Sequence, residues 1–114
     1  MEARAVARYV RSSPRKMRLL VDLIRGKNAA EALAILRFTN KRASHVAEMT
    51  LRSALANLQA KTENPYLSPE SVVVRNVFVD GGPMLKRIQP APMGRAYRIR
   101  KRSHHLTIVV ATKD

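Results

Sequence analysis

Three segments of the chain show the composition and alternation that are typical of β-strands. Residues 3–11 alternate small or apolar residues with arginines, so that Arg4 and Arg8 would project from one face. Residues 71–80 and 106–112 are rich in β-branched side chains. Strict alternation in residues 71–80 predicts that the even-numbered residues share one face of the strand and the odd-numbered residues share the other.

Three other segments repeat apolar residues at helical spacing. Residues 14–25 begin with a proline and carry one apolar stripe, and Gly26 is expected to end this helix. Asn28 and Glu31 have the spacing of a capping box, which predicts the start of a second helix. The longest helix is expected over residues 41–61, where many alanines allow a neighbouring layer to approach closely.

The element order is one strand, three helices and two strands. This order predicts an α+β fold in which three helices pack on a small three-stranded antiparallel sheet. About 25 residues separate the last two strands, too many for a tight turn, and residues 96–102 continue the alternation of a strand. We therefore expect a single domain 1–114, with a globular body (1–80 and 103–114) and a long protruding β-hairpin arm at about residues 81–102.

The distribution of charge along the chain indicates what this arm binds. The chain has 114 residues, with 22 Lys and Arg against 8 Asp and Glu, and its net charge is +14. Residues 81–105 hold seven of the basic residues and no acidic residue. An excess of one charge destabilises a compact chain unless an anionic partner absorbs it, so the composition indicates a nucleic-acid binder.

Other functional classes find little support in the sequence. No apolar stretch is long enough to span a membrane, and the N-terminus lacks the apolar core of a signal peptide, so a soluble intracellular protein is expected. The chain has no cysteine. His104 and His105 are adjacent, so strand alternation would point them to opposite faces. We expect no catalysis, no metal, no cofactor, no membrane contact and no homo-oligomer.

Basic residues of the first strand, the first helix and the arm are the candidate phosphate contacts. Arginine predominates in the arm, and its guanidinium suits bidentate phosphate contacts and stacking on bases. The alternative for the first helix is a solvated face, which the uncompensated charge disfavours. The candidates are Arg4, Arg8, Arg11, Arg15, Lys16, Arg18, Arg25, Lys27, Lys86, Arg87, Arg95, Arg98, Arg100, Lys101 and Arg102. The predicted arm tip consists of Gln89, Pro90, Ala91, Pro92, Met93 and Gly94.

DNA binding is the main alternative from the residues themselves. A helix-turn-helix would use residues 28–61, but the second helix is rich in alanine and has few basic or amide side chains after Arg42. A DNA-bending architectural protein would use the basic ribbon arm, with Pro90, Pro92 and Met93 as an apolar wedge. The sequence pattern leaves this second alternative open.

Three long strings carry a family resemblance. SPRKMRLLVDLIRGK (residues 13–27) resembles the first helix of the L-twenty-two family of bacterial large-subunit ribosomal proteins. VDGGPMLKRIQP (residues 79–90) and GRAYRIRKRSHHLTIVV (residues 94–110) resemble that family's extended hairpin and its return strand. The similarity extends over essentially the whole chain, in the same element order.

The resemblance implies a structural protein of the cytoplasmic ribosome. Such proteins bind 23S rRNA, touch several of its domains and act early in assembly of the large subunit. The body would lie near the peptide exit and the arm along the tunnel wall, with its tip near ribosomal protein L-four, the nascent peptide and bound macrolide antibiotics. The segment Leu85-Lys86-Arg87 matches one that is associated with macrolide resistance.

The chain departs from this family at the arm tip. After the proline that matches Pro90, the family commonly has an alanine between two basic residues, whereas this chain has Ala91-Pro92-Met93. The tip therefore lacks two expected positive charges and gains a stiffening proline, so the family's effects on nascent chains and drugs do not transfer unchanged. In the return strand, His105 matches the family's histidine and His104 is the additional one.

Overall fold

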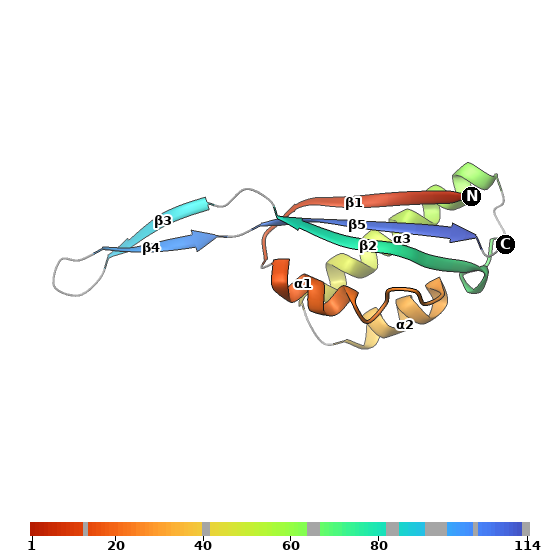
Figure 1. Cartoon of the computed structure of the whole chain (residues 1–114), viewed down its shortest axis with the longest axis horizontal. Coiled ribbons are helices and arrows are strands. Elements are labelled where there is room, and N and C mark those ends of the chain that lie inside the picture. The colour runs from red at the N-terminus through yellow and green to blue at the C-terminus, as the bar shows by residue number, and fades with distance from the viewer. Residues whose placement is uncertain are drawn as a thin grey trace.

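A three-stranded sheet, with helices packed on one face, forms the body of the molecule (Figure 1). The computed structural model describes residues 1–12, 14–39, 42–63, 67–81, 85–90, 96–101 and 103–112, with backbone only for 85–90 and 96–101. Its elements are β1 (Glu2–Val10), α1 (Pro14–Val21), α2 (Ala29–Phe38), α3 (Arg42–Thr62), a 3-10 helix η1 (Pro69–Ser71), β2 (Val72–Gly81), β3 (Leu85–Pro90), β4 (Ala96–Lys101) and β5 (His104–Thr112). The predicted α+β fold class is confirmed.

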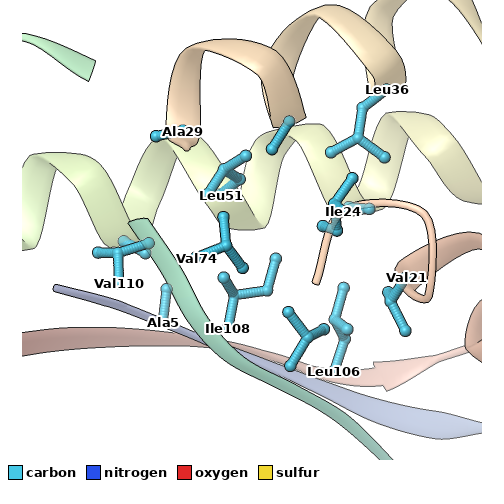
Figure 2. Packing of buried hydrophobic residues seen from close by; sticks show 14 of the residues in the cluster. Ala5, Val21, Ile24, Ala29, Leu36, Leu51, Val74, Leu106, Ile108 and Val110 are labelled. Carbon is cyan, nitrogen blue, oxygen red and sulfur yellow. The ribbon is translucent and has the colours of Figure 1, made fainter. Parts of the chain in front are cut away.

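The central strand of the body sheet is β5, and β1 and β2 pair with it antiparallel on either side. Helix α3 packs against β1 and β5, while α1 and α2 pack against β2. Figure 2 shows the resulting core between helices and sheet, where Ile24, Leu51, Val74 and Ile108 are fully buried. None of the described helices lies against the opposite face of the sheet (Figure 1).

The prediction of strict alternation along β2 is wrong. Val72 and Val74 are buried, as are Val77 and Val79, so the buried positions change from even to odd numbers. The register with β5 shifts between Val74 and Asn76, which is the signature of a β-bulge. A bulge inserts one extra residue into a strand and thereby reverses the phase of its two faces.

The first helix is shorter than the predicted 14–25. Helix α1 ends at Val21, and the chain continues in tighter turns in which Leu23 N–H donates to Leu20 C=O (3.1 Å) and Ile24 N–H to Val21 C=O (3.1 Å). These turns still bury Ile24, so the apolar residues of this segment pack into the core although the helix has ended. Gly26, which was predicted to end this helix, lies at the end of the turns that follow Val21, and its φ of +80° is a left-handed conformation that glycine adopts readily.

The second and third helices follow the sequence pattern more closely. The Asn28 side chain accepts a hydrogen bond from Glu31 N–H at 2.8 Å, which confirms the predicted N-cap of α2. Helix α3 is described from Arg42 to Thr62, one residue beyond the predicted end, and Lys41, where the helix was predicted to begin, lies outside the described residues. No helix in the described part of the chain is long and apolar enough to cross a lipid bilayer.

Strands β3 and β4 form a separate two-stranded antiparallel sheet that extends away from the body, opposite the end where both termini lie (Figure 1). Pairing runs from Leu85 with Lys101 to Pro90 with Ala96. Gln89 and Pro90, which were predicted to form the tip, therefore belong to a paired strand. The remaining predicted tip residues, 91–94, lie outside the described residues.

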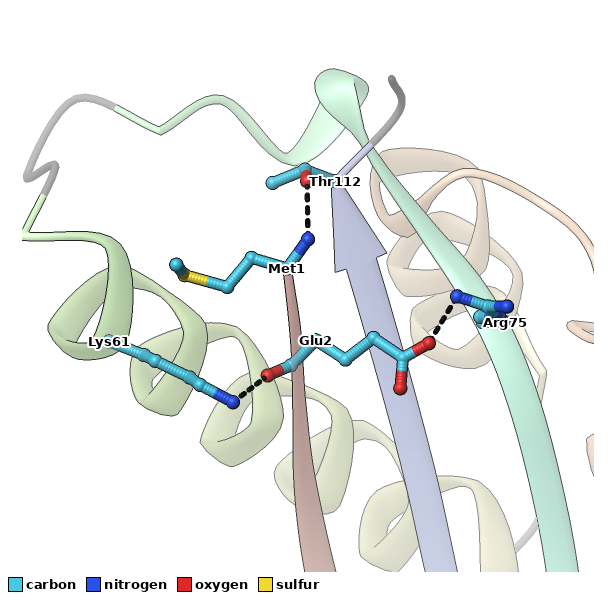
Figure 3. A network of polar contacts seen from close by, with 5 residues as sticks. All are labelled: Met1, Glu2, Lys61, Arg75 and Thr112. Carbon is cyan, nitrogen blue, oxygen red and sulfur yellow. Dashed lines mark hydrogen bonds and ion pairs between the residues drawn. The ribbon is translucent and has the colours of Figure 1, made fainter.

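Polar contacts close the end of the body sheet that is remote from β3 and β4 (Figure 3). The N-terminal amine of Met1 donates to Thr112 Oγ1 at 3.4 Å, and Lys61 Nζ donates to the carbonyl of Glu2 at 2.8 Å. The Glu2 carboxylate reaches across β5 to form an ion pair with Arg75 on β2. These contacts fix the start of β1 against its neighbours.

Candidate nucleic-acid interface

All eight predicted phosphate-binding residues of the body are exposed, and the side chains of six of them make no hydrogen bond or ion pair within the described residues. No carboxylate in the described part of the chain pairs with any of these six, so their charges face solvent uncompensated. They come from β1, from α1 and from the short segments that flank α1. They are Arg4, Arg8, Arg11, Arg15, Lys16 and Lys27.

Arg18 and Arg25 have a structural role that the sequence did not indicate. Arg18 Nη2 donates to the carbonyl of Val79 at 3.0 Å, and Arg25 Nη2 donates to the carbonyl of Val77 at 2.7 Å. Arg25 also forms an ion pair with Asp22. Both guanidinium groups therefore hold the edge of β2, and part of their donor capacity is used before any ligand binds.

The same edge of β2 is also covered by backbone hydrogen bonds. Gly26 N–H donates to Val74 C=O at 3.1 Å, and Val74 N–H donates to Lys27 C=O at 2.9 Å. Exposed strand edges invite pairing with other chains, so proteins commonly cover them. The loop after α1 thus protects β2 and places Lys27 at the surface beside it.

A cavity of about 550 Å³ lies between the end of β1, α1 and the start of α3. Arg11, Lys16 and Arg42 supply cationic groups to its lining, and Leu19 and Val46 are among its apolar lining residues. Arg42 was not among the predicted binding residues. It is far from Arg11 in sequence, and only the packing of α3 brings the two together.

The strand register of the ribbon, β3 with β4, concentrates positive charge. Lys86 on β3 lies directly opposite Arg100 on β4, and Arg98 lies two residues before Arg100 on β4. Like charges at directly opposite positions destabilise an antiparallel pair. Such a ribbon gains stability from an anionic partner. Arg95 and Arg102 lie outside the described residues.

The two adjacent histidines diverge, as strand alternation predicts. His104 is fully buried, with Nδ1 at 3.1 Å from the carbonyl oxygen of Ser12. His105 lies on the other face, half-buried, and its Nδ1 accepts a hydrogen bond from Tyr9 N–H at 3.0 Å. In the described portion of the chain no three His, Asp or Glu residues gather in a way that could hold a metal ion.

The fold and this surface define a basic α+β protein with a projecting two-stranded ribbon and no recognisable catalytic cluster among its described residues. A family model described as "Ribosomal protein L22p/L17e" matches residues 5–111. The chain therefore belongs to this family of ribosomal proteins. It is a structural component of the cytoplasmic ribosome and not an enzyme.

Individual relatives agree with the family match. A protein of Desulfitobacterium hafniense (strain Y51), named "Large ribosomal subunit protein uL22", is 52% identical over 112 residues, which cover 98% of this chain and 96% of the relative. A protein of Chlorobium phaeobacteroides (strain BS1) with the same name is 51% identical over the same shares of the two chains.

Proposed function

We propose that this chain is a structural protein of the large ribosomal subunit that binds 23S rRNA and joins several of its domains during early assembly. The body, residues 1–80 and 103–114, would form one domain with the arm at about residues 81–102. In this arrangement the body lies near the peptide exit and the arm lines the exit tunnel. Membership of the ribosomal family and the uneven charge of the chain support the proposal.

The exposed cations of the body are the observation that carries this proposal. Arg11, Arg15 and Lys16 lie close together in sequence at the junction of β1 and α1, and no carboxylate in the described residues neutralises them. Crowded phosphates, where RNA helices meet, would supply the missing counter-charge. Binding depends on attraction between these cations and RNA phosphates and on the fit of the ribbon between RNA segments. The body neutralises phosphates while the ribbon enters between RNA segments.

A competition experiment tests the nucleic-acid class. Labelled protein is bound to a folded 23S rRNA fragment at moderate salt, and unlabelled duplex DNA is then added. We expect the RNA complex to survive an excess of DNA. A tenfold or greater preference for DNA would instead favour an architectural DNA-bending protein, because both classes show strong salt dependence and salt alone does not separate them.

Arginine variants of β4 test the role of the ribbon. We expect Arg98→Ala and Arg100→Ala each to weaken RNA binding by about 1–2 kcal/mol, the size of a charge-assisted contact. The melting temperature of the body should change little in either variant. A large loss of body stability would show that these residues serve the fold instead of the RNA.

The tip would meet three further partners, namely ribosomal protein L-four, the nascent peptide and macrolide antibiotics. Ala91-Pro92-Met93 is less cationic than the family's usual sequence, so the tip would attract nascent acidic segments less strongly. Ribosomes that carry Ala91→Lys and Met93→Arg should differ from the original in macrolide sensitivity. Identical sensitivity would argue against a tip position near the drug.

A further inference from the structure

The outer face of the body sheet, which none of the described helices covers, presents an ordered row of side chains. Register pairs place Val6 beside Thr107 and Thr107 beside Phe78, so one row crosses all three strands. Val6 is 38% exposed and Phe78 is 40% exposed. Thr107, between them, is buried by its neighbours. This row is a largely apolar strip, and Arg4 and Arg8 lie beside it on β1.

Aromatic and imidazole rings border that strip on one side. Tyr9 has a positive φ of 56°, lies where the pairing of β1 with β5 is interrupted, and is 64% exposed. The Tyr9 and His105 rings meet edge to face, with centroids 4.9 Å apart and planes at 88°. Together with Phe78 and Thr107, these two rings line a shallow hollow of about 350 Å³.

Charged groups frame the hollow. Arg4 and Arg8 of β1 line it on one side, and neither guanidinium has a partner within the described residues. Asp80 of β2 lines it as well, and its register partner on β5 is His105. In the described part of the chain, no ion pair engages the Asp80 carboxylate. The hollow thus has two cations suited to phosphate and one carboxylate that only accepts hydrogen bonds.

We propose that this outer face binds an unpaired guanine base of the RNA, by stacking on Phe78 and by hydrogen bonds to Asp80. The inference rests on the proposed RNA-binding function and names the ligand of one part of that surface. Sequence-specific RNA recognition usually takes splayed-out bases, which stack on aromatic side chains and are read at their pairing edges. Arg4 and Arg8 contact the phosphates that flank the base.

Asp80 supplies the preference for guanine. The pairing edge of guanine carries two adjacent donors, the N1–H and the exocyclic amino group, which match the two oxygens of a carboxylate. The pairing edge of uracil carries a single donor, N3–H, between two carbonyl oxygens that a carboxylate repels. A protein partner is disfavoured because Arg4 and Arg8 form no ion pair within the described residues and would need carboxylates from that partner, whereas RNA supplies phosphates in the same spacing as its bases.

The test uses the full chain, labelled with ¹⁵N, and two single-stranded hexaribonucleotides, UUGUUU and UUUUUU. We expect UUGUUU to shift the amide signals of Val6, Phe78 and Thr107. Phe78→Ala should weaken binding of UUGUUU about tenfold, the effect of losing one stacked base, which corresponds to about 1.4 kcal/mol. Asp80→Asn should reduce the preference for UUGUUU over UUUUUU and leave binding of UUUUUU no weaker.

Phe38→Ala is the matched control, because Phe38 is the only other phenylalanine of the chain and is 84% exposed on α2. Phe78→Tyr, which keeps the ring, should bind like the original, and melting curves establish that each variant is folded. Equal effects of Phe78→Ala and Phe38→Ala, or signal shifts confined to α1 and the ribbon, would overturn the proposal while RNA binding itself persists. Absence of any binding to 23S rRNA would instead refute the proposed function.

Discussion

Arginine residues that look alike in sequence should behave in opposite ways in this protein. Arg18 and Arg25 donate to the Val79 and Val77 carbonyls of β2, at 3.0 and 2.7 Å. Arg15 is exposed on α1 and makes no such contact within the described residues. Alanine substitution of Arg18 or Arg25 should therefore destabilise the fold, whereas Arg15→Ala should weaken RNA binding and leave the fold intact.

The magnitude follows from the geometry. A hydrogen bond from a charged donor contributes about 1.5–3 kcal/mol when it is well shielded. Because the Arg25 side chain is 47% exposed, solvent screening reduces this contribution, and we expect about 1 kcal/mol for each residue. For a domain of this size, a loss of about 1 kcal/mol lowers Tm by about 4 °C.

Thermal denaturation followed by circular dichroism measures the first effect, and titration with a 23S rRNA fragment measures the second. We expect Arg18→Ala and Arg25→Ala to lower Tm, and Arg15→Ala to reduce RNA affinity at unchanged Tm. Arg18→Lys serves as a control, since it keeps the charge but not the planar guanidinium. If Arg18→Ala melted like the original and lost as much RNA affinity as Arg15→Ala, the structural role of Arg18 would be refuted.

Three further predictions concern local structure. Gly26→Ala should destabilise the fold by about 1 kcal/mol, because the φ of this residue is +80°. At Gly81 an added Cβ would meet no atom within 4 Å and φ is not positive, so Gly81→Ala should change the free energy of unfolding by less than about 0.5 kcal/mol. Chemical denaturation of the two variants measures the difference. Asn28→Ala should cost about 1 kcal/mol through loss of the α2 cap, and Asn28→Asp should restore most of it; an unchanged denaturation midpoint in Asn28→Ala would contradict the capping role. In the free protein, the backbone amides of β3 and β4 should exchange faster than those of α3, because an isolated two-stranded ribbon is marginally stable. Hydrogen-exchange mass spectrometry measures both rates. Equal protection of the β3, β4 and α3 amides would contradict an independent arm.

Element types and the capping of α2 could be predicted from the sequence because they depend on local patterns. The buried stripe of the first helical segment was also correctly predicted, and Met17, Leu20, Val21 and Ile24 are all buried. The length of the helix was not correctly predicted, because the turns after Val21 keep Ile24 in the core without a regular helix. The apolar pattern reports which side chains are buried more faithfully than it reports backbone geometry.

Features that depend on contacts between residues far apart in sequence could not be predicted. The bulge at Arg75 reverses the faces of β2, and nothing in SVVVRNVFVD distinguishes it from a regular strand. The roles of Arg18 and Arg25 depend on carbonyl groups more than fifty residues away. Charge composition identified a basic surface, but only the packed structure separates cations that hold the fold from those that face solvent.

Sedimentation of the protein with ribosomal particles tests the central claim most directly. A cell lysate that contains a tagged copy of the chain is separated on a sucrose gradient, and the tag is followed across the fractions. We predict that the tag is found with large subunits and whole ribosomes and is absent from free small subunits. A tag that stays at the top of the gradient, or that sediments with chromosomal DNA after ribonuclease treatment, would contradict the proposed role in the large subunit.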